Sequence, residues 1–110
     1  MKGDISFFSD SYNSAGSKDV GIVNSVNIID IGKKHEQVPM KGEPNSVTVS
    51  IRDGKTTSER YYDENGNVYL DIDYTNHGNP KRHPKVPHQH RWIKDKNDRL
   101  VRGDWEDINK

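Results

Sequence analysis

The chain has no cysteine among its 110 residues, which excludes a disulfide framework and a thiolate metal site. Apolar residues are scarce, since Leu, Ile, Val and Phe fill only 22 of the 110 positions, close to the level at which chains become disordered. No apolar run is long enough to cross a membrane, and no hydrophobic signal segment follows Met1. The formal net charge is zero. We therefore expect one small folded domain with a thin core and no membrane partner.

Strand signals are clearest between residues 46 and 74. Apolar and polar residues alternate over 47–51 (VTVSI) and again over 68–74 (VYLDIDY), which is the pattern of half-buried strands. The dipeptides Asp-Gly at 53–54 and Asn-Gly at 65–66 favour tight hairpin turns. The fold class predicted is mainly β to α+β, built on an antiparallel β-meander over about residues 46–74.

The flanking segments are less regular. Residues 1–19 are rich in Ser, Gly and Asp and are predicted to form a flexible N-terminal arm, with residues 20–110 forming the single globular domain. The Val- and Ile-rich run at 20–31 is predicted to be a strand. A further strand is expected near 88–93, whereas the tail, 94–110, fits a short strand or a short helix.

The stretch between Arg60 and Trp92 concentrates chemistry, since it holds four of the five histidines. In a strand, His88 and His90 project from the same face. Two imidazoles at one spot suit acid–base catalysis or metal ligation. His77 or Asp73 would supply a third group if the last strand returns beside 68–74. Alternatively, one of the paired histidines is exposed and the other only hydrogen-bonds a carboxylate or carbonyl.

Charged residues near the histidines allow further roles. Asp73 would orient a neighbouring histidine or join a metal shell, whereas Asp71 more simply serves a structural role. A guanidinium at Arg60 would stabilise a phosphate in its transition state, or else pair with an acidic residue across the sheet. The segment 81–102 carries eight Lys and Arg against two Asp, which suits either RNA or a solvated surface. The basic residues nearest the histidines are the phosphate-contact candidates: Arg82, Lys85 and Arg91.

Motifs within residues 44–92 extend this interpretation. RYYDENG, DIDYTNHGNP, HP and PHQHRW resemble the C-terminal toxin domains of bacterial polymorphic toxins, in which a long delivery protein, often with YD-type repeats, ends in a small toxin domain. The resemblance implies a nuclease, made with a cognate immunity protein, exported as part of a larger protein and acting in the target-cell cytoplasm. Many such domains resemble a metal-independent ribonuclease fold, which usually begins with helices; residues 1–43 show none.

The leading hypothesis is a ribonuclease that cleaves RNA by transesterification without a cofactor. One of His88 and His90 would take the 2′-hydroxyl proton, while His77 or the other ring would protonate the leaving oxygen. Arg60 or a basic residue of 81–91 would hold the phosphate. One alternative is a divalent-metal nuclease with its ion at His77, His88 and His90.

Two non-nuclease alternatives remain. The first is a small metal- or ligand-binding β module, since H-x-H followed by Asp95 and Gly103 is faintly similar to the cupin barrel motif. The second is a non-catalytic interaction domain.

Overall fold

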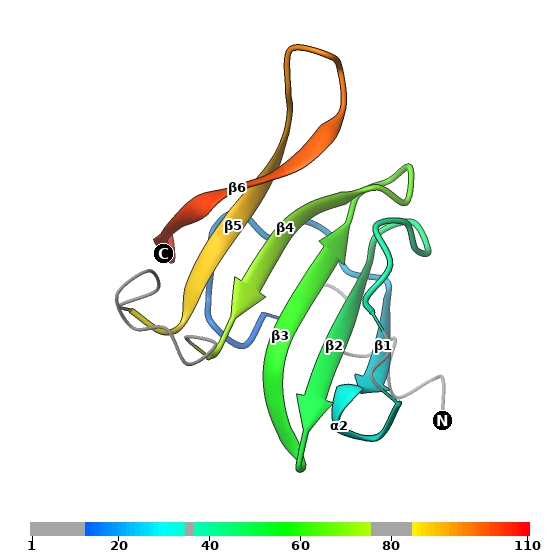
Figure 1. The fold of residues 1–110 in the computed structure, drawn as a ribbon, viewed down its shortest axis with the longest axis vertical. Helices are drawn as coiled ribbons and strands as arrows, with labels where there is room; N and C mark the ends of the chain where they lie inside the picture. Colours follow the sequence, from blue (N-terminus) through cyan, green and yellow to red (C-terminus); the bar gives the residue numbers. More distant parts are fainter. Residues whose placement is uncertain (1–12, 35–36, 76–84) are drawn as a thin grey trace.

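The computed structural model describes residues 13–34, 37–75 and 85–110. Within these ranges the chain forms one six-stranded sheet and one short helix, shown in Figure 1. In chain order the elements are β1 (Ser25–Asp30), α2 (Ile31–Lys34), β2 (Ser46–Arg52), β3 (Lys55–Tyr62), β4 (Val68–Asp73), β5 (His88–Lys94) and β6 (Leu100–Asp107). This mainly β, small single domain confirms the predicted fold class.

The order of strands in the sheet is the order of strands in the chain. β1 lies parallel to β2, and every later neighbour pair is antiparallel. The predicted meander over 46–74 is therefore confirmed as β2, β3 and β4, and the predicted strand near 88–93 is confirmed as β5. The return of β5 along β4 brings the histidine pair beside the acidic end of the meander.

The turn between β2 and β3 follows the sequence signal. Asp53 and Gly54 have φ values of 52° and 77°, as in the mirror-image turns that match the twist of a hairpin. Elsewhere the boundaries differ from expectation. The strand predicted over 20–31 is confined to β1, since residues 20–24 form no strand and Ile31 begins α2. The ambiguous tail forms a strand, β6. Among the described residues, no helix has the length and apolar character needed to cross a membrane.

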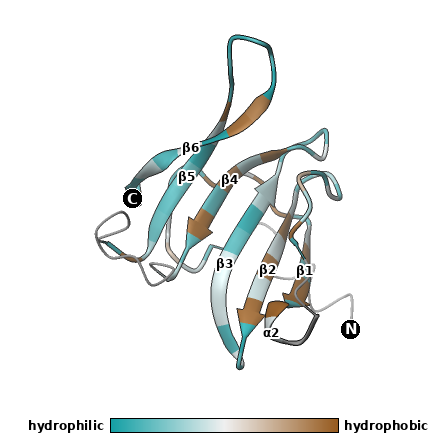
Figure 2. Ribbon diagram, viewed as in Figure 1, coloured by the Kyte–Doolittle hydropathy of each residue, from teal (hydrophilic) through white to brown (hydrophobic). Residues whose placement is uncertain are grey.

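The apolar core lies on one face of the central strands. Its sheet residues are Val47, Val49, Tyr61, Leu70 and Ile72, all buried. The first described segment of the chain runs behind the sheet in Figure 1 and covers this face, adding Ala15 and Val23 to the same core. Figure 2 shows how hydropathy is distributed over the sheet: hydrophobic residues gather in β1, β2 and β4, whereas β5 is largely hydrophilic.

Part of the predicted N-terminal arm lies in the described region. Ala15 and Ser17 are buried, and the Ser17 hydroxyl donates a hydrogen bond of 2.7 Å to the amide oxygen of Gln89 in β5. Residues 13–19 thus contact the sheet. The boundary between arm and domain at residue 19 stays a prediction.

Candidate metal or catalytic centre

The opposite face of β3, β4 and β5 carries charged side chains. Asp71 pairs with Arg60 of β3 on one side and with His90 of β5 on the other, while Asp73 pairs with His88. Since residues two apart in a strand share a face, the alternation of each strand gathers these five side chains on one surface. The sequence predicted a shared face for the two histidines and named Asp73 as a possible third group; the structure places Asp71 and Arg60 on the same face.

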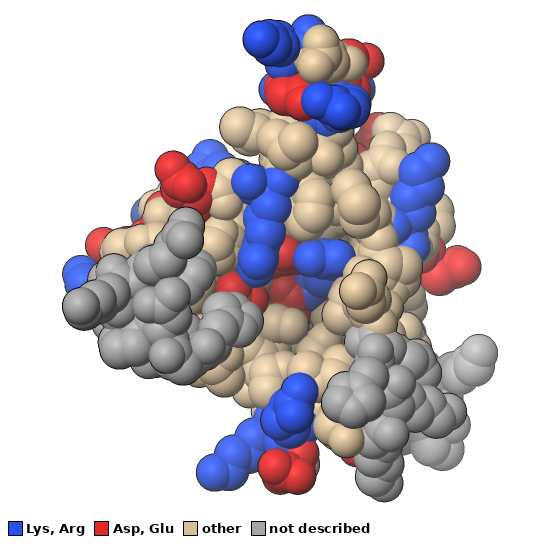
Figure 3. Space-filling view, in the orientation of Figure 1, with Lys and Arg blue, Asp and Glu red and all other residues tan. Residues whose placement is uncertain are grey.

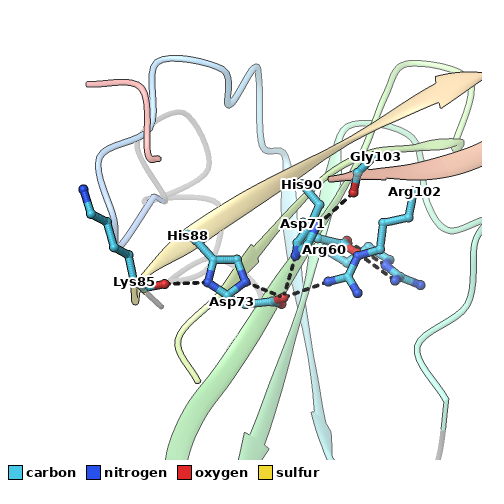
Figure 4. Close-up of polar contacts among 8 residues, drawn as sticks. All are labelled: Arg60, Asp71, Asp73, Lys85, His88, His90, Arg102 and Gly103. Carbon is cyan, nitrogen blue, oxygen red and sulfur yellow. Dashed lines mark hydrogen bonds and ion pairs between the residues drawn. The ribbon is translucent and has the colours of Figure 1, made fainter. Parts of the chain in front are cut away.

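The two imidazoles converge on one carboxylate oxygen. Nε2 of His88 and Nε2 of His90 each lie 3.3 Å from Oδ2 of Asp73. The rings are nearly perpendicular, with centroids 5.0 Å apart and an interplanar angle of 77°. Figure 4 shows both rings turned toward Asp73. We call Asp73, His88 and His90 the imidazole–carboxylate cluster.

Backbone carbonyls fix the orientation of both rings. Nδ1 of His88 lies 2.7 Å from the carbonyl oxygen of Lys85, and Nδ1 of His90 lies 2.9 Å from that of Gly103. A carbonyl oxygen only accepts hydrogen bonds, so each Nδ1 must donate its proton. In the neutral ring, Nε2 then carries the lone pair. A neutral ring therefore turns a nitrogen able to accept a proton, or to bind a metal, toward Asp73, and a protonated ring donates to Asp73 from the same Nε2.

The close approach of β6 to β5 requires a glycine at position 103. The sheet register shifts between His90 and Trp92, opposite the point where β6 passes Arg91. A Cβ added at Gly103 would lie 2.8 Å from the carbonyl oxygen of Arg91, too close for ordinary packing. A glycine at this position lets β6 approach closely enough for its carbonyl oxygen to reach His90.

Two arginines flank the cluster. Arg60 forms a two-pronged pair with Asp71, with Nε to Oδ1 at 2.8 Å and a terminal nitrogen to Oδ2 at 2.9 Å. Arg102 of β6 bridges the two carboxylates, 3.2 Å from Oδ2 of Asp71 and 2.8 Å from Oδ2 of Asp73. The two guanidinium charges therefore balance the two carboxylate charges, and the site is neutral before any imidazole is protonated.

Arg60 is held from several sides. A terminal nitrogen donates to the carbonyl oxygen of Val38 at 2.8 Å, and the guanidinium lies 5.0 Å from the ring centroid of Trp92. Burial acts to lower the pKa of Arg60, but the hydrogen bond and negative charge of Asp71 outweigh it and raise that pKa above its usual value. Arg60 is thus a fixed positive charge.

Exposure differs sharply among these groups. The side chains of His88 and Asp73 are 0% and 2% exposed, and that of His90 is 5% exposed. Arg60 and Arg102 reach the surface, at 17% and 37%. In Figure 3 acidic groups lie deeper, between basic groups, at the middle of this face. The guanidiniums are the parts of the site that solvent reaches most easily.

The remaining predicted site residues do not join this group. His77 and Arg82 lie outside the described residues. The Lys85 side chain is exposed and 3.5 Å from Asp107, although its carbonyl oxygen contacts His88. Arg91 pairs with Glu106 and Asp19, on the core side of the sheet, away from the cluster.

Sequence reasoning also missed two contributors, Arg102 and the carbonyl of Gly103. Residues 94–110 fitted either a short strand or a short helix, so the sequence did not show which face Arg102 would join. Had residues 100–107 been assigned to a strand, the position of Arg102 within it would have been available, although its partners would not.

This arrangement permits two kinds of chemistry. Two lone-pair nitrogens beside a carboxylate can exchange protons with a bound molecule. One ligand atom from each of Asp73, His88 and His90 also lies within 4.8 Å of the other two, so the cluster could hold a metal ion. The carbonyl-bound Nδ1 atoms suit both uses, because ligating histidines usually donate their second nitrogen to a carbonyl or carboxylate.

Comparisons with other proteins add no family to this picture. No family model, curated protein or solved structure matches the chain. The likeness to polymorphic-toxin domains rests on the motifs of residues 44–92 alone and stays a prediction.

Proposed function

We propose that the chain is a toxin-type nuclease domain that cleaves RNA at the imidazole–carboxylate cluster. The observation that carries the proposal is the convergence of two Nε2 atoms on one oxygen of Asp73, at 3.3 Å each. Imidazole is the usual acid–base group near neutral pH. The toxin-domain resemblance supplies the choice of nucleic acid as substrate.

The chemistry is transesterification without a metal. Nε2 of His90 takes the 2′-hydroxyl proton of the ribose, the 2′ oxygen bonds to phosphorus, and the bond to the 5′ oxygen breaks. A protonated imidazole, that of His77 or of His88, gives its proton to the leaving oxygen. His90 is assigned the base role because its side chain is the less buried of the two, 5% exposed against 0% for His88.

The phosphate contact falls to the arginines of the same face. Arg102 is the more exposed of the two and retains N–H groups beyond those facing the carboxylates. Arg60, the less exposed of the two, adds a second positive charge, which stabilises the extra negative charge of the phosphorane-like transition state. Arg91, on the core side of the sheet, is not part of this contact.

The carbonyl oxygen of Gly103 positions the ring of His90. Asp73 stabilises the imidazolium that forms when Nε2 takes the proton, as the carboxylate of a catalytic triad does. Removing a positioned acid–base group slows such reactions by about 10²–10⁴-fold. The biological setting follows from the resemblance: export as the end of a longer protein, action in the target-cell cytoplasm, and neutralisation by a cognate immunity protein.

A second version uses the same residues to hold a divalent metal for hydrolysis. The closeness of the three ligand atoms, all within 4.8 Å of one another, favours this metal version. Cleavage with and without EDTA distinguishes it from the metal-free version.

The test incubates purified protein with total RNA and with duplex DNA, with and without EDTA. We expect RNA cleavage that survives EDTA and is lost in His90→Ala. Asp107→Asn is the matched control, because Asp107 is an exposed carboxylate in register with His88 on the neighbouring strand. Cleavage abolished by EDTA would replace the metal-free mechanism with the metal version. Intact RNA and DNA after incubation with the wild type would contradict nuclease function altogether.

A further inference from the structure

Two of the three distances among the ligand atoms of the cluster match the edges of a tetrahedral metal site. Zinc binds imidazole nitrogen and carboxylate oxygen at about 2.0–2.2 Å, so neighbouring ligand atoms in a tetrahedron are about 3.3–3.6 Å apart. Both Nε2-to-Oδ2 distances are 3.3 Å. Two edges of the tetrahedron are therefore already set in the folded chain.

The surroundings satisfy the second requirement of such a site. Ligating imidazoles must be neutral and must present one fixed nitrogen. The carbonyl oxygens of Lys85 and Gly103, from the loop before β5 and from β6, impose this on His88 and His90. The ring orientations are thus held by backbone atoms on both sides of β5, and no side chain has to move to present the nitrogens.

From this geometry we propose that Asp73, His88 and His90 bind one divalent transition metal ion of the zinc class. With two imidazoles and one carboxylate, the ligand set suits Zn²⁺, Co²⁺ or Ni²⁺ and not Ca²⁺ or Mg²⁺, which prefer all-oxygen shells. The proposal does not depend on RNA cleavage, since the ligand geometry is the same whether or not the chain is a nuclease. An Nε2 that binds the ion has no lone pair left to take a proton, so a bound ion should inhibit the metal-free reaction assigned to His90.

The charge of the site shapes how the ion binds. The carboxylates of Asp71 and Asp73 are already matched by Arg60 and Arg102. A divalent ion would leave the buried site with excess positive charge, which is costly. The fourth ligand is therefore anionic, a hydroxide or a phosphate oxygen. It follows that removing the charge of Arg102 should tighten metal binding.

The test titrates metal-free protein with Zn²⁺ by calorimetry and with Co²⁺ by visible absorption. We expect one ion per chain, a tetrahedral Co²⁺ spectrum, and a higher Tm with saturating Zn²⁺. His88→Ala and His90→Ala should each weaken binding by at least about 100-fold. Asp107→Asn, the exposed carboxylate in register with His88, should bind as the wild type does.

Two further variants keep the test decisive if His90→Ala is unstable and if the ion binds elsewhere. His90→Gln keeps a polar side chain of similar length, so it serves if His90→Ala fails to fold. Arg102→Gln should bind Zn²⁺ at least about tenfold more tightly, because a positive charge beside the ion is removed. Unchanged or weaker binding in Arg102→Gln would count against an ion next to Asp73.

The overturning results do not depend on nuclease activity. Absence of Zn²⁺ and Co²⁺ binding by the folded wild type would refute the site. Binding that persists undiminished in His88→Ala and His90→Ala would place the ion elsewhere in the chain and also refute it. RNA cleavage without metal binding would leave the nuclease proposal standing and this one overturned.

Discussion

The two faces of the central strands bury side chains of opposite kinds. On one face Val47, Leu70 and Ile72 pack under the segment that begins at residue 13, with almost no exposed area. On the other, the same strands bury Asp71 and Asp73, joined by His88 from β5. The first face removes apolar surface from water, which stabilises the fold. The second takes charges out of water, which opposes folding unless each is compensated.

The difference indicates what each face contributes. A buried set of charges is rarely more stable than apolar residues of the same volume. In a chain with so few apolar residues, burying aspartate and histidine on the second face gives up core that the domain needs. We infer that the charged face exists for chemistry and that the apolar face supplies most of the stability.

Truncation of the apolar face should have the largest effect on stability. Ile72 is 0% exposed, and Ile→Ala substitutions in cores cost about 2–5 kcal/mol. We expect Ile72→Ala to lower the free energy of unfolding by that amount in urea denaturation, a large part of the total for a small domain. Ile93→Ala, at a position 55% exposed, is the control and should change it by less than about 0.5 kcal/mol. Equal effects would remove the contrast between core and surface.

On the charged face, breaking one ion pair should lower the free energy of unfolding by less than Ile72→Ala does. A second substitution should restore much of that loss. Asp71→Ala leaves Arg60 without its two-pronged partner. Arg60 is partly exposed, so we expect a loss of about 2 kcal/mol, between the values for surface and buried pairs. Adding Arg60→Met to Asp71→Ala should restore much of it. A double variant no more stable than Asp71→Ala would show that the pair itself stabilises the fold.

The apolar face also buries a carboxyl group, that of Glu59, whose substitution should have the smallest effect. Its side chain is fully buried and accepts hydrogen bonds from the hydroxyls of Tyr61 and Tyr74 at 2.9 and 3.1 Å. Glu59→Gln keeps an acceptor for both hydroxyls without a titratable carboxyl group. We expect the free energy of unfolding at pH 7 to stay level or rise by about 1 kcal/mol, measured in urea. A loss of more than about 1 kcal/mol would assign the carboxyl a stabilising role on this face.

Much of the fold could be predicted because it is encoded locally. Period-two alternation gave the strands at 47–51 and 68–74, and an Asp-Gly dipeptide placed the turn at 53–54, where both residues adopt positive φ. The same period placed both rings of H-x-H on one face. The carboxylate of Asp73 became a neighbour as soon as β5 was taken to return along β4.

What the sequence could not supply depends on register and on distant partners. The pairing of Arg60 with Asp71 follows from the alignment of β3 and β4, which the turn after Tyr62 sets. Arg102 reaches the cluster only because β6 lies beside β5 across a register shift. The grouping of Arg91 with the phosphate-contact residues overlooked the same alternation that united the histidines, since Arg91 lies between His90 and Trp92.

The proposed chemistry of the imidazole–carboxylate cluster can be tested in a single comparison. The RNA-cleavage rate of the wild type would be measured beside that of His90→Gln, with the Tm of both recorded. We expect His90→Gln to lower the cleavage rate by at least about 100-fold with little change in Tm, because the apolar face is untouched. Equal rates in the two proteins, or no cleavage by the wild type, would contradict it.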